Sequence, residues 1–240
     1  MKAAIISQAR IGSARLPGKV LFNIKDKSLL QYHIERLKQS CLPVIIATTT
    51  SECDDSIVNV CQDTKTIFFR GDEDNVLCRY YKCAVENKVD IIIRVTSDCP
   101  LVDGSLIKKG IELFEKHGVD YLSNTGDRTF PRGFDFEILN FNALETAYAN
   151  ADTQQEREHV TPYIWRTHPS KFKILGFMNN VDKSQYRITV DTNEDFTLVK
   201  KLIEDFDADK KTYKEIIKLL DDNQSLARIN KDVKQKIYWK

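Results

Sequence analysis

The segment ARIGSARLPGK, residues 9–19, carries three cationic side chains directly after a short apolar run. Arg10, Arg15 and Lys19 can neutralise a polyphosphate, because arginine forks bind pairs of phosphate oxygens and a lysine ammonium adds a compact charge. The segment is therefore predicted to be an anion-binding loop. The alternative is an ordinary loop whose cations are solvated.

Two glycines in this segment favour the same prediction. Gly12 and Gly18 permit backbone angles at which N–H groups converge on an anion. The segment is neither a GxGxxG motif nor a Walker A loop, because five residues separate the glycines and Val20 follows Lys19. We therefore expect a phosphate-binding loop of another kind.

Two aspartates are expected to lie beside this loop. Asp98 ends the apolar segment 90–98, and Asp191 directly follows the segment 186–190. If both segments are parallel strands beside the strand 3–7, both carboxylates point into the crevice that the loop borders. Two carboxylates beside phosphates suit Mg²⁺, with Mn²⁺ as a substitute, because Mg²⁺ prefers a few carboxylates plus waters and phosphate oxygens. For either aspartate alone, the alternative is a cap at the end of a strand.

The elements that must position these residues alternate between strands and helices. Predicted strands lie at 3–7, 43–49, 66–69, 90–98 and 186–190. Predicted helices follow Ser28 and lie at 54–63, 75–86, 104–117, 141–150, 193–206 and 212–222, with Thr192 and Asp195 as a capping box. Continuous apolar strands joined by helices indicate an α/β fold, a three-layer sandwich with a mostly parallel sheet covered on both faces.

The alternation is interrupted between residues 120 and 180. We expect a single domain over residues 1–240, in which segment 120–180 is an insert that builds a substrate lid or a dimer contact. The basic tail 225–240 is expected to be solvated.

Composition limits the partners. The chain has 240 residues and a formal net charge of +1, from 36 basic and 35 acidic side chains, which argues against a bulk nucleic-acid or membrane-surface binder. No apolar stretch approaches the roughly 18 residues of a membrane span, and we expect no signal peptide. The six cysteines are scattered without a CxxC pair, which favours reduced thiols and a cytoplasmic location.

The loop resembles the N-terminal signature of the sugar-activating cytidylyltransferases, which include the 3-deoxy-manno-octulosonate and acylneuraminate enzymes. The resemblance is strongest to the branch associated with spore-coat polysaccharide synthesis. It extends over most of the chain through five further blocks, GDEDNVLCRYYKCA (71–84), RVTSDCPLVD (94–103), PRGFDFEI (131–138), EREHVTPYI (156–164) and RITVDTNEDF (187–196).

This resemblance implies a nucleotide-diphospho-sugar transferase (Rossmann-like) fold. It also implies a reaction in which CTP and a small sugar give a CMP-sugar and pyrophosphate, or a CDP-sugar if the acceptor is a sugar phosphate. Arg15, Lys19, Asp98 and Asp191 would be catalytic, and the two aspartates would hold the metal. The nucleotide would contact Gln8, Ala9, Arg10, Gly12, Ser13, Arg15, Lys19, Asp72, Asp74, Asn75 and Ser97. The resemblance also suggests a homodimer.

Four residues of segment 120–180 are candidates for sugar binding. They are Arg132, Asp135, Glu137 and His159, and their alternative is a polar, exposed surface. Arg94 interrupts an apolar strand, so it is expected either to pair with a buried carboxylate or to reach a ligand.

Two other functions compete with this prediction. The acidic triplet 72–74 follows a predicted strand, where metal-dependent glycosyltransferases that use a nucleotide sugar hold their metal. The same triplet can instead stabilise a helix N-terminus through the helix dipole. A non-catalytic nucleotide-binding protein is the other alternative.

Overall fold

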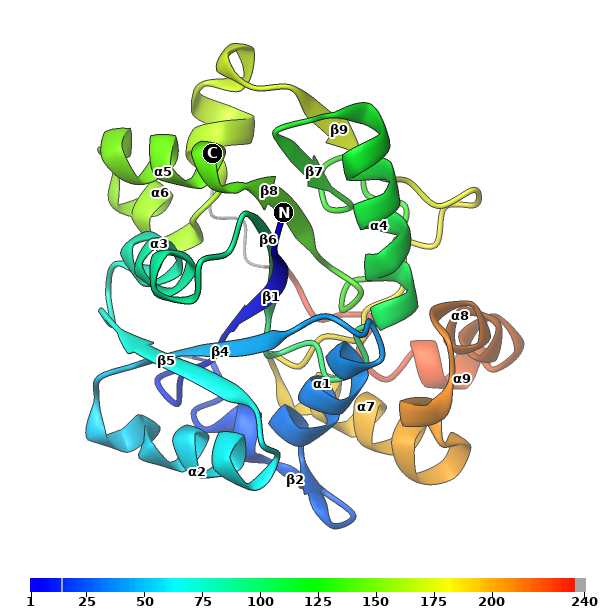
Figure 1. Cartoon of the computed structure of the whole chain (residues 1–240). Coiled ribbons are helices and arrows are strands. Elements are labelled where there is room, and N and C mark those ends of the chain that lie inside the picture. Colours follow the sequence, from blue (N-terminus) through cyan, green and yellow to red (C-terminus); the bar gives the residue numbers. More distant parts are fainter. Residues whose placement is uncertain (14, 236–240) are drawn as a thin grey trace.

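The computed structural model describes residues 1–13 and 15–235. A seven-stranded sheet with the order β5-β4-β1-β6-β8-β7-β9 crosses the described part of the chain (Figure 1). Its strands are β1 (Ala3–Gln8), β4 (Val44–Thr49), β5 (Ile67–Gly71), β6 (Ile91–Thr96), β7 (Tyr121–Ser123), β8 (Glu137–Asn140) and β9 (Ile174–Gly176). A small hairpin pairs β2 (Asn23–Ile24) with β3 (Lys27–Ser28).

Seven of the described helices agree closely with predicted ones. The described helices are α1 (Leu29–Lys38), α2 (Asp55–Asp63), α3 (Val76–Asn87), α4 (Gly104–His117), α5 (Phe141–Asn150), α6 (Gln154–His159), α7 (Asn193–Phe206), α8 (Tyr213–Asp222) and α9 (Gln224–Ala227), of which α6 and α9 were not predicted. Thr192 caps α7 in a capping box with Asp195, as predicted, and Ser28 caps α1 in a second capping box, with Gln31.

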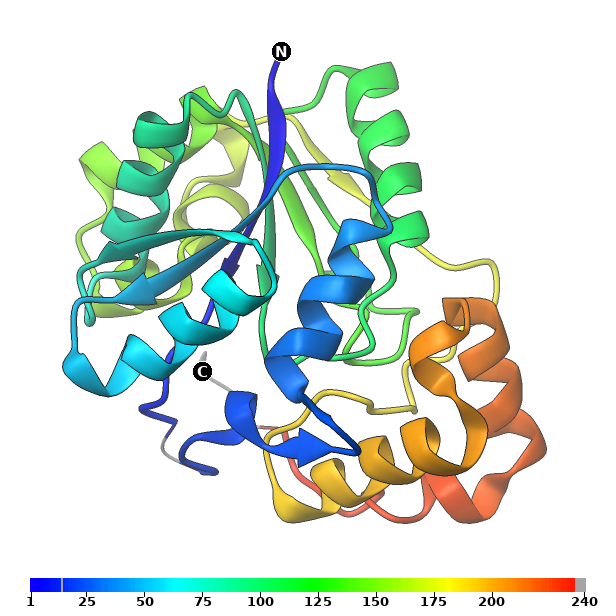
Figure 2. The same ribbon diagram turned by 60° about the horizontal axis from the view of Figure 1, so that its bottom comes forward.

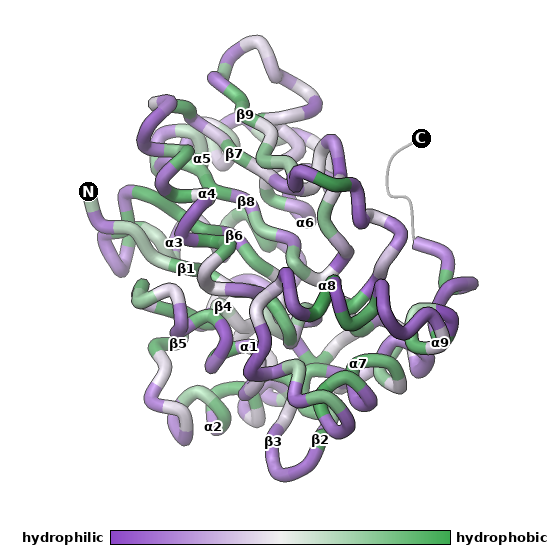
Figure 3. The backbone as a smooth tube through the Cα atoms, turned by 90° about the vertical axis from the view of Figure 1, so that its right-hand side faces the viewer, coloured by the Kyte–Doolittle hydropathy of each residue, from purple (hydrophilic) through white to green (hydrophobic). Residues whose placement is uncertain are grey.

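The central strands are parallel and buried on both faces. β1 pairs in parallel with β4 and β6, and β4 pairs in parallel with β5, whereas β8 runs antiparallel to β6 and β7. Alternate residues of β1 enter different cores: Ile5 packs with residues of α1, α2 and α4, and Ile6 with residues of α3 and α5. Figure 3 shows hydrophobic residues concentrated on these strands. The predicted α/β class and mostly parallel sheet are confirmed.

The prediction of a strand at 186–190 is wrong. β8 occupies the sheet position beside β6, so this segment lies outside the sheet and makes one isolated bridge, between Arg132 and Arg187. The segment nevertheless lies beside Asp98, as expected, because the Val190 N–H donates to the Asp98 carbonyl at 2.8 Å. In Figure 2 the loop after β1 and the start of α7 lie at the same end of the molecule.

The C-terminal segment is more ordered than expected up to residue 235. Leu226 and Asn230 are buried, and the Asn230 side chain donates to the Arg187 carbonyl and to Asp195. The prediction of a solvated tail is therefore wrong for these residues, and residues 236–240 lie outside the described part of the chain. No helix among the described residues has both the length and the apolar character to cross a bilayer.

Candidate active site

A cavity of about 300 Å³ opens at the carboxyl end of β1. The first turn of α3 and the residues that follow β6 complete its wall. Most of the residues expected to contact a nucleotide line it, namely Gln8, Ala9, Arg10, Ser13, Arg15, Lys19 and Ser97. Asp98 and Asp191 line the same cavity, so the loop and both carboxylates meet.

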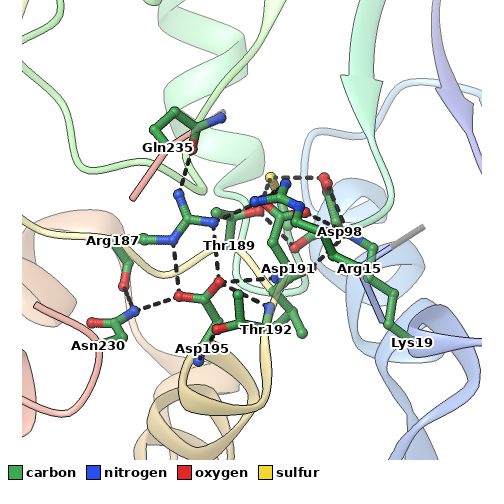
Figure 4. A network of polar contacts seen from close by, with 12 residues as sticks. Arg15, Lys19, Asp98, Arg187, Thr189, Asp191, Thr192, Asp195, Asn230 and Gln235 are labelled. Carbon is green, nitrogen blue, oxygen red and sulfur yellow. Dashed lines mark hydrogen bonds and ion pairs between the residues drawn. The ribbon is translucent and has the colours of Figure 1, made fainter. Parts of the chain in front are cut away.

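Lys19 lies between the two carboxylates. Its ammonium is 3.2 Å from Asp98 Oδ2 and 2.7 Å from Asp191 Oδ1, and it also donates to the Val190 carbonyl at 2.7 Å (Figure 4). Lys19 is only 8% exposed. Burial alone would lower the pKa of Lys19, but the charges of Asp98 and Asp191 outweigh burial and raise this pKa. Burial alone would raise the pKa of Asp98, but the charge of Lys19 outweighs burial and lowers this pKa. Asp98 therefore stays ionised.

Two arginines bind the other oxygen of Asp191. Arg15 lies 2.8 Å and Arg187 2.7 Å from Asp191 Oδ2, and Arg187 also makes a fork with Asp195 at 2.8 and 3.0 Å. Arg187 is a site residue that the sequence analysis missed. The available signal was the same as for Arg94, a cation inside a short apolar run.

Four residues predicted to bind nucleotide do not line the cavity: Gly12, Asp72, Asp74 and Asn75. Asp72 Oδ1 accepts from the backbone N–H groups of Asp74 and Asn75, and Asn75 caps α3 by accepting from Cys78. These contacts order the turn before α3. The Asp72 carboxylate therefore has a local role in this turn.

A second cavity, of about 260 Å³, adjoins the first. Arg94, Thr96 and His159 line both cavities. All four residues predicted to bind the sugar line this second cavity, namely Arg132, Asp135, Glu137 and His159. Arg128 binds both carboxylate oxygens of Asp135, at 2.6 and 3.0 Å.

Glu137 is buried and forms an ion pair with Arg94, which is partly buried, in the wall between the cavities. Glu137 also accepts from the hydroxyls of Tyr121 and Thr161, and Arg94 reaches Gln8 Oε1 at 3.3 Å. Burial alone would lower the pKa of Arg94, but the charge of Glu137 outweighs it and raises this pKa. Of the two expectations for Arg94, pairing with a buried carboxylate is confirmed.

His33 lies beneath the first cavity and is fully buried. Its Nδ1–H donates to the Cys99 carbonyl at 2.8 Å, so Nε2 accepts from the Ser7 hydroxyl at 2.8 Å, and Ser7 contacts Ser97. Burial lowers the pKa of His33 to about 4. The imidazole is therefore neutral at physiological pH and links α1 to the ends of β1 and β6.

This pKa predicts acid sensitivity. Because His33 titrates near its ordinary 6.5 when unfolded, the unfolded chain binds one more proton between pH 6.5 and about 4. The free energy of unfolding is therefore expected to fall by about 3 kcal/mol across that window from this residue. The measurement is urea unfolding at pH 7.5, 6, 5 and 4.5 for the wild type and His33→Asn. Parallel pH profiles for the two proteins would contradict the prediction.

The sequence of this chain is similar to those of several known proteins. The chain is 38% identical to an uncharacterized protein of Methanocaldococcus jannaschii, over 99% of this chain and 98% of that one. It is 37% identical to the spore coat polysaccharide biosynthesis protein SpsF of Bacillus subtilis, over 82% of this chain and 84% of SpsF. A shorter match, 31% identical over 48% of this chain and 46% of the other, is to 3-deoxy-manno-octulosonate cytidylyltransferase of Bdellovibrio bacteriovorus.

Among solved structures, a cytidylyltransferase from Leptospira borgpetersenii is similar over the full length of both chains, with a TM-score of 0.92 and 34% identity. The sequence model of the cytidylyltransferases matches residues 3–237. The resemblance found in the sequence is thereby confirmed, and the chain belongs to the cytidylyltransferase family.

Proposed function

We propose that this protein transfers a cytidylyl group from CTP to a small sugar, releasing pyrophosphate, for the synthesis of a polysaccharide or another glycan. The observation that carries the proposal is the pair of adjoining cavities. One contains the cationic loop and the two aspartates, and the other contains the predicted sugar-binding residues. The shared wall of Arg94, Thr96 and His159 would bring the two substrates into contact.

In the proposed reaction, an oxygen of the sugar attacks the α-phosphorus of CTP in line. The new P–O bond forms as the bond to the bridging oxygen breaks, and pyrophosphate leaves. Arg10, Arg15, Lys19 and the backbone around Gly12 and Ser13 would bind and orient the phosphates. Fixed cations and N–H groups stabilise the charge that develops on the α-phosphate and on the leaving group, so no protein nucleophile is needed.

The donor set also fits Mg²⁺. Asp98 and Asp191 already present one oxygen each to a single cation, the Lys19 ammonium. Two carboxylates beside phosphate oxygens are ligands that Mg²⁺ prefers. When bound there, Mg²⁺ would supply electrostatic stabilisation of the phosphates. Lys19 and Arg15 would then shift their contacts from the carboxylates to the phosphate oxygens.

Metal removal tests this part of the proposal. Pyrophosphate release is expected to stop in EDTA and to return when Mg²⁺ or Mn²⁺ is added in excess. Thermal unfolding in the same buffers serves as the control, because Lys19, Arg15 and Arg187 hold the two carboxylates without a metal. Full turnover in the chelator would contradict a metal site at Asp98 and Asp191.

The remaining assignments extend the proposal. Asp72, Asp74 and Asn75 would lie near the cytosine, because a Cβ built on Gly12 of the loop would be only 3.8 Å from the intervening Glu73 carboxylate. Residues 1–240 would form a single domain, with segment 120–180 contributing the sugar cavity or a dimer contact. A cytoplasmic location agrees with the six cysteines, which are all free. The proposal also includes a homodimer.

The deciding experiment measures pyrophosphate release with CTP, UTP, ATP and GTP in the presence of Mg²⁺. Each nucleotide is offered 3-deoxy-manno-octulosonate, several nonulosonates and a set of sugar phosphates. Turnover with CTP and one acceptor supports the proposal and identifies the substrate. Failure to bind CTP in calorimetry with Mg²⁺ would refute it. Transfer of a sugar from a nucleotide sugar, without pyrophosphate release, would favour the glycosyltransferase.

A further inference from the structure

Asp54 is a buried carboxylate that does not perform the usual role of its position. It is the N-cap residue of α2, where an aspartate normally accepts from a backbone N–H of its own helix. The Asp54 side chain makes no such hydrogen bond, although the residue is only 1% exposed. Buried polar groups are normally satisfied, so the partners of this carboxylate have to come from other segments.

The two oxygens of Asp54 bind two different segments. Oδ2 accepts from the end of β4, namely from the Thr48 hydroxyl at 3.2 Å and from the Thr49 hydroxyl and N–H at 2.5 and 3.3 Å. Oδ1 accepts from the Ile11 N–H at 2.7 Å, across 43 positions of the sequence. A carboxylate suits this place, because both of its oxygens are acceptors, whereas an amide offers only one. Asp54 thereby connects the cationic loop to β4.

Ile11 is the residue on which the cationic loop closes. Its carbonyl accepts from the Ser13 N–H at 2.7 Å and from the Gly18 N–H at 3.0 Å. Gly18 has a left-handed backbone conformation, with a φ of +70°, and Lys19 follows it directly. The position of Ile11 therefore helps to fix Ser13 and Lys19, which both line the first cavity.

The charge of Asp54 acts against phosphate binding. Burial lowers the pKa of Arg79, which lines the first cavity, and the charge of Asp54 opposes part of this shift. The field of Asp54 therefore extends to the cavity wall, where it would repel a phosphate. Because this charge is unfavourable for an anionic ligand, any contribution of Asp54 to binding has to come from the hydrogen bonds that it accepts.

We propose that Asp54 is a positioning residue for phosphate binding: by accepting from Ile11, it fixes the cationic loop in the shape that receives a triphosphate. The inference rests on the proposed function, because it takes the ligand of the loop to be a triphosphate. A loop that is ordered in the free protein does not lose conformational freedom when its ligand binds, so it binds more tightly. Removal of Asp54 then weakens phosphate binding, even though it also removes an anion.

The test measures binding by calorimetry with Mg²⁺, using CTP and inorganic tripolyphosphate as ligands. Asp54→Ala is expected to bind both ligands about tenfold more weakly than the wild type, the scale of one hydrogen bond to a charged group. Asp54→Asn keeps the side-chain volume and one acceptor oxygen, so its affinities should lie between those two proteins. A purely electrostatic role of Asp54 predicts the opposite sign, tighter binding by both variants.

Thr48→Val is the matched control, because it removes a hydroxyl that donates to Oδ2 and leaves the Ile11 contact in place. It should lose stability in urea unfolding but bind both ligands within about twofold of the wild type. Hydrogen exchange in the absence of ligand measures the loop directly. The Ile11 amide should exchange slowly in the wild type and in Thr48→Val, and about tenfold or more faster in Asp54→Ala.

Several results would overturn the inference. One is unchanged or tighter binding by the two Asp54 variants, and another is equal weakening in Thr48→Val and Asp54→Ala. Fast exchange of the Ile11 amide in the unliganded wild type overturns it without any variant. If the wild type binds tripolyphosphate but not CTP, the proposed function has failed, and the inference is decided by tripolyphosphate binding. If the wild type binds neither ligand, both have failed.

Discussion

Asp191→Asn is expected to lower kcat/KM for pyrophosphate release by about 10²-fold or more, the scale for removing one preorganised electrostatic group. The Asp191 carboxylate forms ion pairs with Lys19, Arg15 and Arg187 at N···O distances of 2.7–2.8 Å. It is also one of the two proposed metal ligands. The variant should remain folded, because Asp195 still holds Arg187 through two hydrogen bonds. Steady-state kinetics and thermal unfolding together separate the two effects.

Asp222→Asn is a suitable control for this variant. Asp222 pairs with Lys218 on the exposed surface of α8, so the same chemical change there removes a carboxylate of little energetic weight. Its activity should equal that of the wild type. An Asp191→Asn enzyme with a third or more of wild-type activity would show that this carboxylate is not part of the catalytic machinery.

Glu137→Leu is expected to have the largest effect on stability. The substitution leaves Arg94 charged and without its carboxylate in the wall between the cavities, and it removes the acceptor for Tyr121 and Thr161. Breaking a buried ion pair on one side costs about 3–5 kcal/mol, because the remaining charge is uncompensated. Urea unfolding at pH 7 measures this loss.

The double variant Arg94→Met/Glu137→Leu tests the stated cause. Replacing both members of a buried pair by apolar residues of similar volume costs far less than removing one. The double variant should therefore recover most of the stability that Glu137→Leu loses. If it unfolds as easily as the single variant, the loss comes from packing or from the two hydroxyls and not from the orphaned guanidinium.

Much of the fold could be predicted because its signals are local. Ser28 with Gln31 and Thr192 with Asp195 are complete capping boxes within four residues, and the structure contains both. The sequence correctly predicts that Asp98 and Asp191 lie close together, but one premise of that prediction is wrong. The strand at 186–190 is absent from the sheet, yet one backbone hydrogen bond from Val190 to Asp98 brings the two carboxylates together.

The rest depends on contacts between distant segments. An apolar run such as 186–190 does not reveal that β8 takes the neighbouring place in the sheet. The Arg187 guanidinium donates to Asp195, and the Arg187 carbonyl accepts from the side chain of Asn230. Asn230 lies 43 residues further along the chain. Arg79 stands among polar residues of an amphipathic helix, and only the three-dimensional structure shows that its guanidinium is buried. Local patterns predict helix ends well but not which buried cation finds a counter-ion.

The ion pairs around Lys19 have a consequence for turnover. Without a nucleotide the cationic loop already has counter-ions of its own, since Asp191 accepts from both Lys19 and Arg15. In the proposed reaction, entry of a triphosphate would exchange one set of anions for another, and the carboxylates of Asp98 and Asp191 would replace the departing pyrophosphate. Such internal competition lowers the net affinity for any single phosphate group. In the proposed reaction it would keep a strongly charged pocket from retaining pyrophosphate.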